Sequence, residues 1–207
     1  MSHQAPLNAT VGAIPLDVNE CFPFPGSGAS LRIMTTLKSM TALETPHLIV
    51  REIERDDGDE LAAFMTQPRY QKHIAHRLRD RAMVQDFVNR QIAARADVRR
   101  HVFHLAAEEK FSGDVVGEGF VIAHRDGSHE LGWGIHPAMW SMGFGTEVGR
   151  ALLGLGFEHL RAKRMWCKVM TPNIASAKLA RRIGMALVTT HSNHPIGNGQ
   201  FGEVDIY

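Results

Sequence analysis

A pair of glycines at the start of a helical segment is the feature that most constrains this sequence. Gly143 and Gly145 flank Phe144, after a strand-like segment and before the helical periodicity of Thr146 to Leu160. Glycines let backbone N–H groups converge on an anion without obstruction by side chains. The N-terminus of the helix adds about half a positive charge at the same place. We therefore expect the backbone amides of Met142 to Thr146 to bind a phosphate group.

Two alternatives to a phosphate loop follow from the same glycines. An ordinary turn between a strand and a helix also contains glycines at this spacing, and the turn alone leaves that alternative open. A dinucleotide-binding fold needs a third glycine at position 148, where the chain has Val148. It also needs alternating strands and helices, whereas three consecutive strands are expected before the turn. The dinucleotide fold is therefore disfavoured.

The hydrophobic pattern predicts a mixed succession of strands and helices. Alternating residues predict strands at 48–53, 102–107, 115–123, 130–135, 165–170, 187–190 and 203–207. Helical spacing predicts helices at about 60–65, 81–96, 145–160 and 174–184. The expected order is a strand, two helices, three strands, a helix, a strand, a helix and two strands.

The first 45 residues differ in texture from the rest. They contain four of the nine prolines and show no sustained periodicity. Such a segment lacks the regular apolar spacing that secondary structure needs. We expect an irregular extension over 1–45 and one domain over 46–207.

Composition excludes several classes of partner. The chain has 23 basic and 22 acidic residues, so it carries no excess charge for nucleic acid or a membrane surface. No stretch approaches the roughly 20 apolar residues of a membrane span. The two cysteines, Cys21 and Cys167, lie in very different contexts and do not indicate a disulfide framework. We expect a cytoplasmic protein without a nucleic-acid or membrane partner.

Three motifs, in order, resemble those of the GNAT acetyltransferase family. Trp140 to Glu147 resembles the stretch Trp-Gly-Lys-Gly-Tyr-Ala-Thr-Glu of the branch that includes ribosomal-protein N-terminal acetyltransferases. Glu130 to Trp133 is similar to the acidic–apolar–glycine–aromatic strand that precedes that stretch. Asn173 to Ser176 is similar to the family's Asn-x-x-Ser helix, which ends here at Gly184. The resemblance spans about 46–207.

The resemblance also has departures. Ser141 and Met142 replace the usual small residue and lysine, so one positive charge near the phosphates is missing. Many family members place a tyrosine near the leaving thiolate. Here Tyr70 and Tyr207 are the only tyrosines, and both lie outside the motifs.

The resemblance implies an α+β (mixed α/β) fold, the GNAT acyl-CoA N-acyltransferase fold. Its mostly antiparallel sheet is flanked by helices, and two central strands, here 130–136 and 165–170, splay apart. The pantetheine arm of acetyl-CoA would lie between them, against the backbone of Ile135 and His136, with the Ile135 N–H facing the acetyl oxygen. The pyrophosphate-binding residues would be Met142, Gly143, Phe144, Gly145 and Thr146.

The resemblance further implies acyl transfer from a thioester to an amine, which must lose a proton before it attacks. Glu130 is the first candidate base, because alternation places Gly132 and Gly134 on its side and leaves space there. A solvated carboxylate is the alternative. Asn173 is expected to contact the pantetheine arm or only to cap its helix. Ser176 is a candidate donor to the leaving sulfur, or an ordinary serine of the first turn.

The expected activity is N-acetyltransfer from acetyl-CoA to a primary amine, either a protein N-terminus or a small molecule. Acetyl-CoA is the cosubstrate. No metal is expected, because His191 and His194 lie three residues apart without a third ligand. A homodimer is compatible with the sequence. The alternative is a non-catalytic CoA-binding module that acts as a sensor or interaction domain.

Overall fold

The computed structural model describes residues 42–75, 77–197 and 199–207. The expected extension lies outside the described residues over 1–41. Its last part belongs to the sheet, because β1 (Leu43–Glu44) pairs antiparallel with β2 (Leu48–Glu52). The first described strand therefore begins a few residues before the expected domain boundary.

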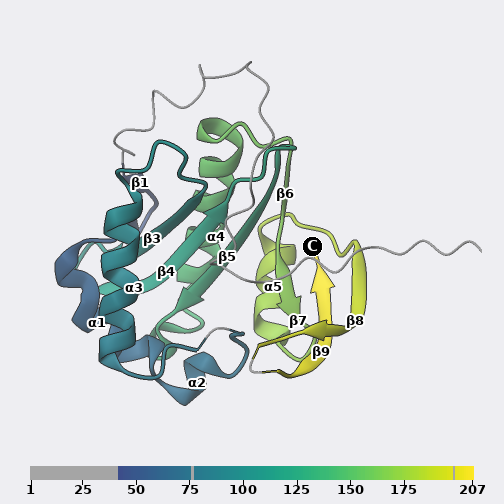
Figure 1. Cartoon of the computed structure of the whole chain (residues 1–207), viewed down its shortest axis with the longest axis horizontal. Helices are drawn as coiled ribbons and strands as arrows, with labels where there is room; N and C mark the ends of the chain where they lie inside the picture. Colours follow the sequence, from purple (N-terminus) through teal and green to yellow (C-terminus); the bar gives the residue numbers. More distant parts are fainter. Residues whose placement is uncertain (1–41, 76, 198) are drawn as a thin grey trace, which may run out of the picture. The chain divides into compact units, whose positions relative to one another are not determined.

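A six-stranded sheet forms the centre of the described region, in the order β1 to β6 (Figure 1). Its longer strands are β3 (Val102–Glu109), β4 (Val115–Ile122) and β5 (Ser128–Ile135), which pair antiparallel as the turns between them require. The short β6 (Arg164–Trp166) pairs parallel with β5. The predicted strands in this part of the chain are confirmed.

The predicted strand at 165–170 divides in two at Cys167. After β6, the chain continues as β7 (Lys168–Met170), which pairs with β9 (Phe201–Ile206) in a second sheet that β8 (Thr189–Pro195) completes. The first half of the segment 165–170 thus belongs to the large sheet, and the second half belongs to the second sheet. The strand predicted at 187–190 is only partly correct, since β8 begins at Thr189 and continues to Pro195. The hydrophobic pattern could not locate β8, because this exposed edge strand has no alternating apolar face.

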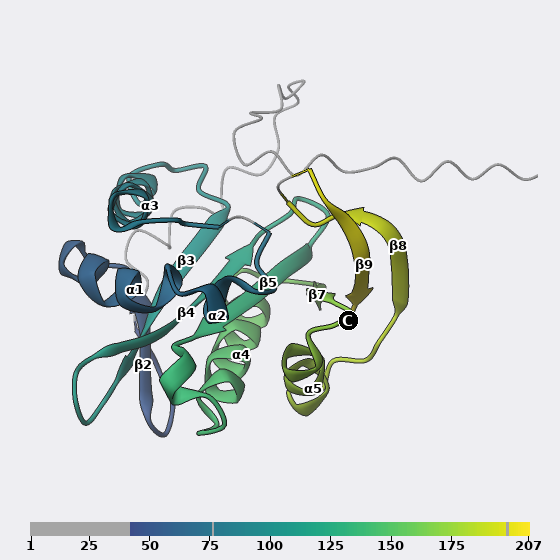
Figure 2. The ribbon, with the colours of Figure 1, turned by 90° about the horizontal axis from the view of Figure 1, so that it is seen from below.

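Helices cover both faces of the large sheet (Figure 2). One face carries α1 (Gly58–Met65), α2 (Pro68–Gln71) and α3 (Arg81–Ala94), and the other carries α4 (Phe144–Gly154). The last helix, α5 (Ile174–Arg182), lies next to α4 and beside the second sheet. The last turn of α4 widens into a π-helical turn, Leu155–His159. The four predicted helices are confirmed, whereas α2 was not predicted because four residues are too few to show a helical period. No described helix combines the length and apolarity that crossing a membrane requires.

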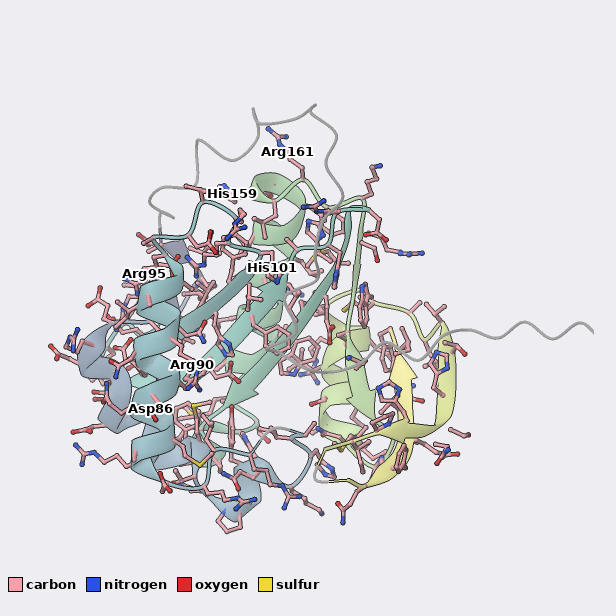
Figure 3. The ribbon with its side chains drawn as sticks, viewed as in Figure 1. Asp86, Arg90, Arg95, His101, His159 and Arg161 are labelled. Carbon is pink, nitrogen blue, oxygen red and sulfur yellow. The ribbon has the colours of Figure 1, made fainter. Side chains whose placement is uncertain are left out.

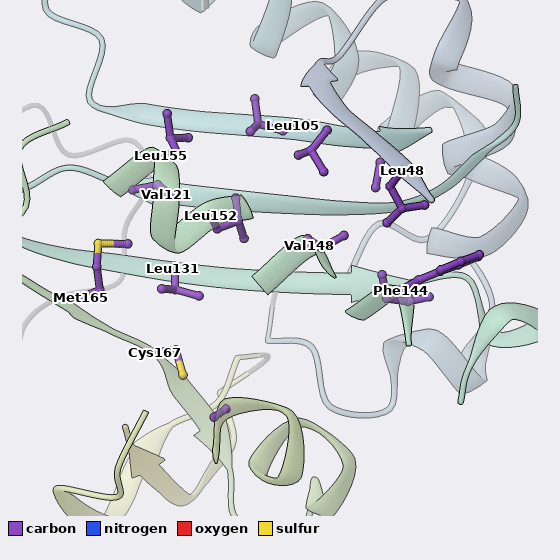
Figure 4. Close-up of a cluster of buried hydrophobic side chains, with 14 of the residues drawn as sticks. Leu48, Leu105, Val121, Leu131, Phe144, Val148, Leu152, Leu155, Met165 and Cys167 are labelled. Carbon is purple, nitrogen blue, oxygen red and sulfur yellow. The ribbon is translucent and has the colours of Figure 1, made fainter. Parts of the chain in front are cut away.

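The main core lies between the sheet and α4 (Figure 4). Buried side chains of four strands, Leu48, Leu105, Val121 and Leu131, meet a buried stripe on the helix, Phe144, Val148, Leu152 and Leu155. The stripe follows the i, i+4 and i+3 spacing of one helical face. This packing holds the first residue of α4 against the end of β5. A second core, under α1 and α3, includes Phe64, Val84, Val88 and Ala106.

Candidate active site

Among the described residues, no strand pairs with one side of the second half of β5. β5 and β6 pair only from Ser128 to Glu130, and β7 then turns away to pair with β9. Residues Leu131 to Ile135 therefore keep one unpaired edge, which we call the splayed edge of β5. An unpaired edge presents N–H and C=O groups that can bind an extended ligand.

The backbone of Ile135 faces this splayed edge. The N–H of His136 donates to the carbonyl oxygen of Val116 on β4 at 2.8 Å. Backbone groups of successive residues in an antiparallel strand point to opposite sides, so those of Ile135 point away from β4. Its carbonyl oxygen accepts a hydrogen bond from Trp140 Nε1 at 2.8 Å, and its N–H lies beyond the last pair with β6. The amide of His136, in contrast, is already paired.

The turn before α4 has the backbone that its glycines predict. Ser141 and Gly143 have positive φ angles, 70° and 92°, and Gly143 is the N-cap. The N–H of Thr146 donates to the Gly143 carbonyl at 2.9 Å, whereas the first amides of a helix have no intrahelical acceptor. The amides of Phe144 and Gly145 are therefore the ones that the turn leaves for an anion.

Gly145 has a second reason to be a glycine. A Cβ at this position would lie 2.5 Å from Leu179 Cδ1 of α5. Its small size lets the two helices approach closely, so the spacing of the two glycines serves packing as well as the open turn.

Two arginines lie beside this turn, and sequence reasoning missed both. They line a surface hollow with residues of the turn and of the β1–β2 connection, namely Thr45, Pro46, Gly143, Thr146, Arg150 and Arg182. Arg150 follows Thr146 by one helical turn, which is a local signal that could have been used. Arg182 ends α5, and only the fold brings it here. Glu44 and Glu147 also line the hollow, and Arg150 and Arg182 are the cations beside a loop that lacks the family's lysine.

Glu147 fastens the β1–β2 connection to α4. Its carboxylate accepts hydrogen bonds from the Thr45 hydroxyl at 2.6 Å and the His47 amide at 3.0 Å, and contacts His47 Nδ1 at 2.7 Å. Partial burial raises the pKa of Glu147, but these bonds lower it by more, so the net shift is downward. The carboxylate thereby holds one wall of the hollow in place.

Glu130, the predicted base, lies at the closed end of the splayed edge. It is the last residue of β5 that pairs with β6, and its Oε1 lies 3.3 Å from Lys168 Nζ. Burial raises the pKa of Glu130, and the nearby Lys168 opposes this shift only in part. A base with a raised pKa is chemically suitable, but this one is already paired with an ammonium group.

The space expected over Gly132 and Gly134 is filled. A Cβ at 132 would overlap the ring of Phe120, and one at 134 would overlap the hydroxyl of Tyr70. Tyr70 donates this hydroxyl to Glu118 Oε1 at 2.8 Å. Sequence reasoning missed this arrangement, because Tyr70 and Glu118 lie 48 residues apart and neither belongs to a motif.

Asn173 and Ser176 both lie at the start of α5. Asn173 caps α5, and its Oδ1 accepts a hydrogen bond from the Ser176 amide at 3.2 Å. Both side chains are partly exposed at the start of α5. The predicted helix cap at Asn173 is thus confirmed. The capping bond uses only the side-chain oxygen of Asn173, and the side-chain NH₂ group takes no part in it.

The geometry combines a splayed strand edge with an open helix N-terminus. The model of the acetyltransferase (GNAT) domain family matches residues 47–186. The chain belongs to the GNAT acetyltransferase family and has its fold.

Known proteins agree with this assignment. The uncharacterized N-acetyltransferase YnaD of Bacillus subtilis is 24% identical over 143 residues, which cover 69% of this chain and 81% of YnaD. A GNAT-family acetyltransferase structure from Bacillus anthracis is similar with a TM-score of 0.71 and 17% identity, over 81% of this chain and 96% of that one.

A further similar structure is RimL, a ribosomal L7/L12 α-N-protein acetyltransferase in complex with coenzyme A. Its TM-score is 0.69 at 14% identity, and the similarity covers 81% of this chain and 96% of RimL. At this identity the likeness establishes the fold and leaves the acceptor open. Within the described residues, no group of three His, Cys, Asp or Glu side chains is placed to hold a metal ion.

Proposed function

We propose that this protein transfers an acetyl group from acetyl-CoA to a primary amine, by direct attack of the amine on the thioester. The observation that carries the proposal is the position of the Ile135 N–H on the splayed edge of β5, next to the open turn before α4. An N–H at this position can stabilise the oxygen of the acetyl carbonyl as it becomes an oxyanion.

The phosphates of acetyl-CoA would lie at the turn. The amides of Met142, Gly143, Phe144 and Gly145 would hold the pyrophosphate, as oriented N–H groups at a helix N-terminus do. Thr146 would contribute its side chain, since its amide is paired within the turn. Arg150 and Arg182, on the adjoining hollow, would supply the charge that Met142 lacks.

The pantetheine arm would run along the splayed edge towards Ile135. Asn173 would contact it through the side-chain NH₂ group, and Ser176 would donate to the leaving sulfur. His136 would line the arm with its ring, because its amide is paired with β4. Glu130 remains a candidate base at the closed end of the edge. The low cysteine content favours the cytoplasm as the compartment.

The acceptor is proposed to be a protein N-terminus or a small amine. Thiol release from acetyl-CoA, measured with a panel of ribosomal-protein N-terminal peptides and polyamines, tests the activity. We expect turnover with at least one class of amine and none with N-acetylated controls. Tight binding of acetyl-CoA without turnover on any amine would contradict the proposal and would favour a CoA-binding sensor.

A further inference from the structure

A row of three polar side chains crosses the α1–α3 face of the large sheet. Tyr70 of α2 donates to Glu118 Oε1 at 2.8 Å, and Glu118 Oε2 contacts His104 Nε2. Tyr70 is 8% exposed and Glu118 is 6% exposed. We call these three residues the Glu118 row. His104 packs against Phe87 of α3, the helix that the labelled side chains of Asp86, Arg90 and Arg95 mark in Figure 3.

The Glu118 row ends against the splayed edge of β5. Glu118 and Gly134 are partners in the β4–β5 register. A Cβ at position 134 would overlap the Tyr70 hydroxyl oxygen and lie 2.5 Å from Glu118 Oε1. Gly134 directly precedes Ile135, whose N–H faces the expected position of the acetyl group. The row therefore lies beside the reacting centre.

Glu130 lies farther along the strand. It is four residues before Gly134, which corresponds to about 13 Å at the usual rise of a strand. Glu130 also has an ammonium partner in Lys168 at 3.3 Å. Of Glu118 and Glu130, Glu118 is therefore the closer to Ile135 along the β4–β5 register.

In the part of the chain that the structure describes, no permanent cation pairs with Glu118. The groups in contact with it are the Tyr70 hydroxyl and the His104 imidazole. The neighbouring helices contribute apolar rings, Phe64 of α1 at 5.1 Å from the Tyr70 ring and Phe87 of α3 at 4.7 Å from the His104 ring. Among the described residues, no lysine or arginine pairs with Glu118. A buried carboxylate is costly without a cation, and an incoming ammonium group can supply one.

We propose that Glu118 attracts the ammonium group of the acceptor and takes up the proton that this ammonium group must lose. The Tyr70 hydroxyl relays the proton between them. This inference rests on the proposed function. One ammonium proton moves to the Tyr70 oxygen as the hydroxyl proton moves to Glu118. The free amine then forms the C–N bond with the thioester carbonyl, the C–S bond breaks, and the leaving sulfur takes the second proton that the nitrogen releases.

The state of Tyr70 suits this role. Burial and the neighbouring Glu118 raise the pKa of Tyr70 well above its usual value. Tyr70 therefore stays a hydroxyl that can pass a proton on. His104 holds the second carboxylate oxygen and fixes the orientation of the carboxylate, so it is a positioning residue.

The test compares Glu118→Gln with the wild-type enzyme and with Glu158→Gln, which removes an exposed charge on the π-helical turn. We expect Glu118→Gln to lower kcat/KM for the amine about 10²-fold, as loss of acid–base catalysis does, with an unchanged Kd for acetyl-CoA. The loss should shrink as the pH rises towards the pKa of the amine, because free amine then needs no base. Glu158→Gln should behave as the wild type.

Tyr70→Phe is the second variant, since it keeps the ring in the core and removes only the hydroxyl. It should show the same loss and the same rescue at high pH. If the wild-type enzyme is active and Glu118→Gln has an unchanged kcat/KM, the role of Glu118 is overturned and the proposed function stands. The same would follow if Glu130→Gln showed the pH-dependent loss and Glu118→Gln did not. A wild-type enzyme inactive on every amine would overturn the proposed function itself.

Discussion

The indole nitrogen of Trp140 donates a hydrogen bond to the carbonyl oxygen of Ile135 at 2.8 Å. This bond joins the turn before α4 to the end of β5, so it fixes that turn relative to the splayed edge. The guanidinium of Arg69 lies 4.6 Å from the Trp140 ring centroid and extends the contact to α2. One side chain thus connects three segments of the site.

Trp140→Phe should raise the KM for acetyl-CoA by about 3- to 10-fold, which corresponds to about 1 kcal/mol for one hydrogen bond. The ring remains, but the turn loses its bond to the strand. Steady-state kinetics with varied acetyl-CoA provide the measurement. An unchanged KM would show that the turn is held by its other contacts.

Gly134→Ala should both destabilise and inactivate the protein. The added methyl would overlap the Tyr70 hydroxyl, and overpacking of a core typically costs about 1–3 kcal/mol. Gly154→Ala is the matched control, because no atom lies within 4 Å of a Cβ there. Urea unfolding should show a lower midpoint for the first variant only. Equal stability of both variants would contradict the close packing over β5.

Arg150→Gln and Arg182→Gln should each weaken acetyl-CoA binding about 3- to 10-fold. This is the loss expected for one exposed, charge-assisted hydrogen bond to a phosphate. Arg90→Gln, on the opposite face of the sheet, should leave the affinity unchanged. Isothermal titration with acetyl-CoA measures all three. Wild-type affinity in both of the first variants would exclude the hollow from the binding site.

Glu147→Gln should lower stability at neutral pH by about 1 kcal/mol, because the bonds to Thr45 and His47 are partly exposed. The folded pKa of Glu147 is lower than the usual value of a glutamate, so its contribution is fully present above that usual value. The contribution is lost as the pH falls through the folded pKa. The difference between wild type and variant should therefore shrink as the pH falls below the usual pKa of a glutamate, measured by urea unfolding. A constant difference would argue against the carboxylate as its source.

Cys167 should resist alkylation in the folded protein. Burial, with a smaller contribution from Glu130, raises the pKa of its thiol to about 12. The thiolate is the reactive form, so almost none is present at pH 8. Mass spectrometry after iodoacetamide treatment should find Cys167 unmodified before unfolding and modified after it. Rapid modification of the native protein would show that this strand opens readily.

Local patterns predicted most of the fold. The alternation in β3 to β5 and the apolar stripe of α4 repeat within a few residues, so they are visible without a structure. The break at Cys167 was not visible, because both of its halves are equally apolar and only their partners differ. The helix α2 and the edge strand β8 were missed or misplaced for a related reason, since neither shows a periodic apolar face.

In the candidate site, too, some features follow from the local sequence and others only from the tertiary structure. The sequence by itself determined the open turn at Gly143, the cap at Asn173 and the family, because each depends on neighbours in the chain. Only the tertiary structure decided that Glu130 is paired with Lys168 and that Tyr70, Glu118 and His104 meet beside Gly134. These contacts join residues far apart in the chain. They depend on strand register and helix packing, which no local spacing of residues encodes.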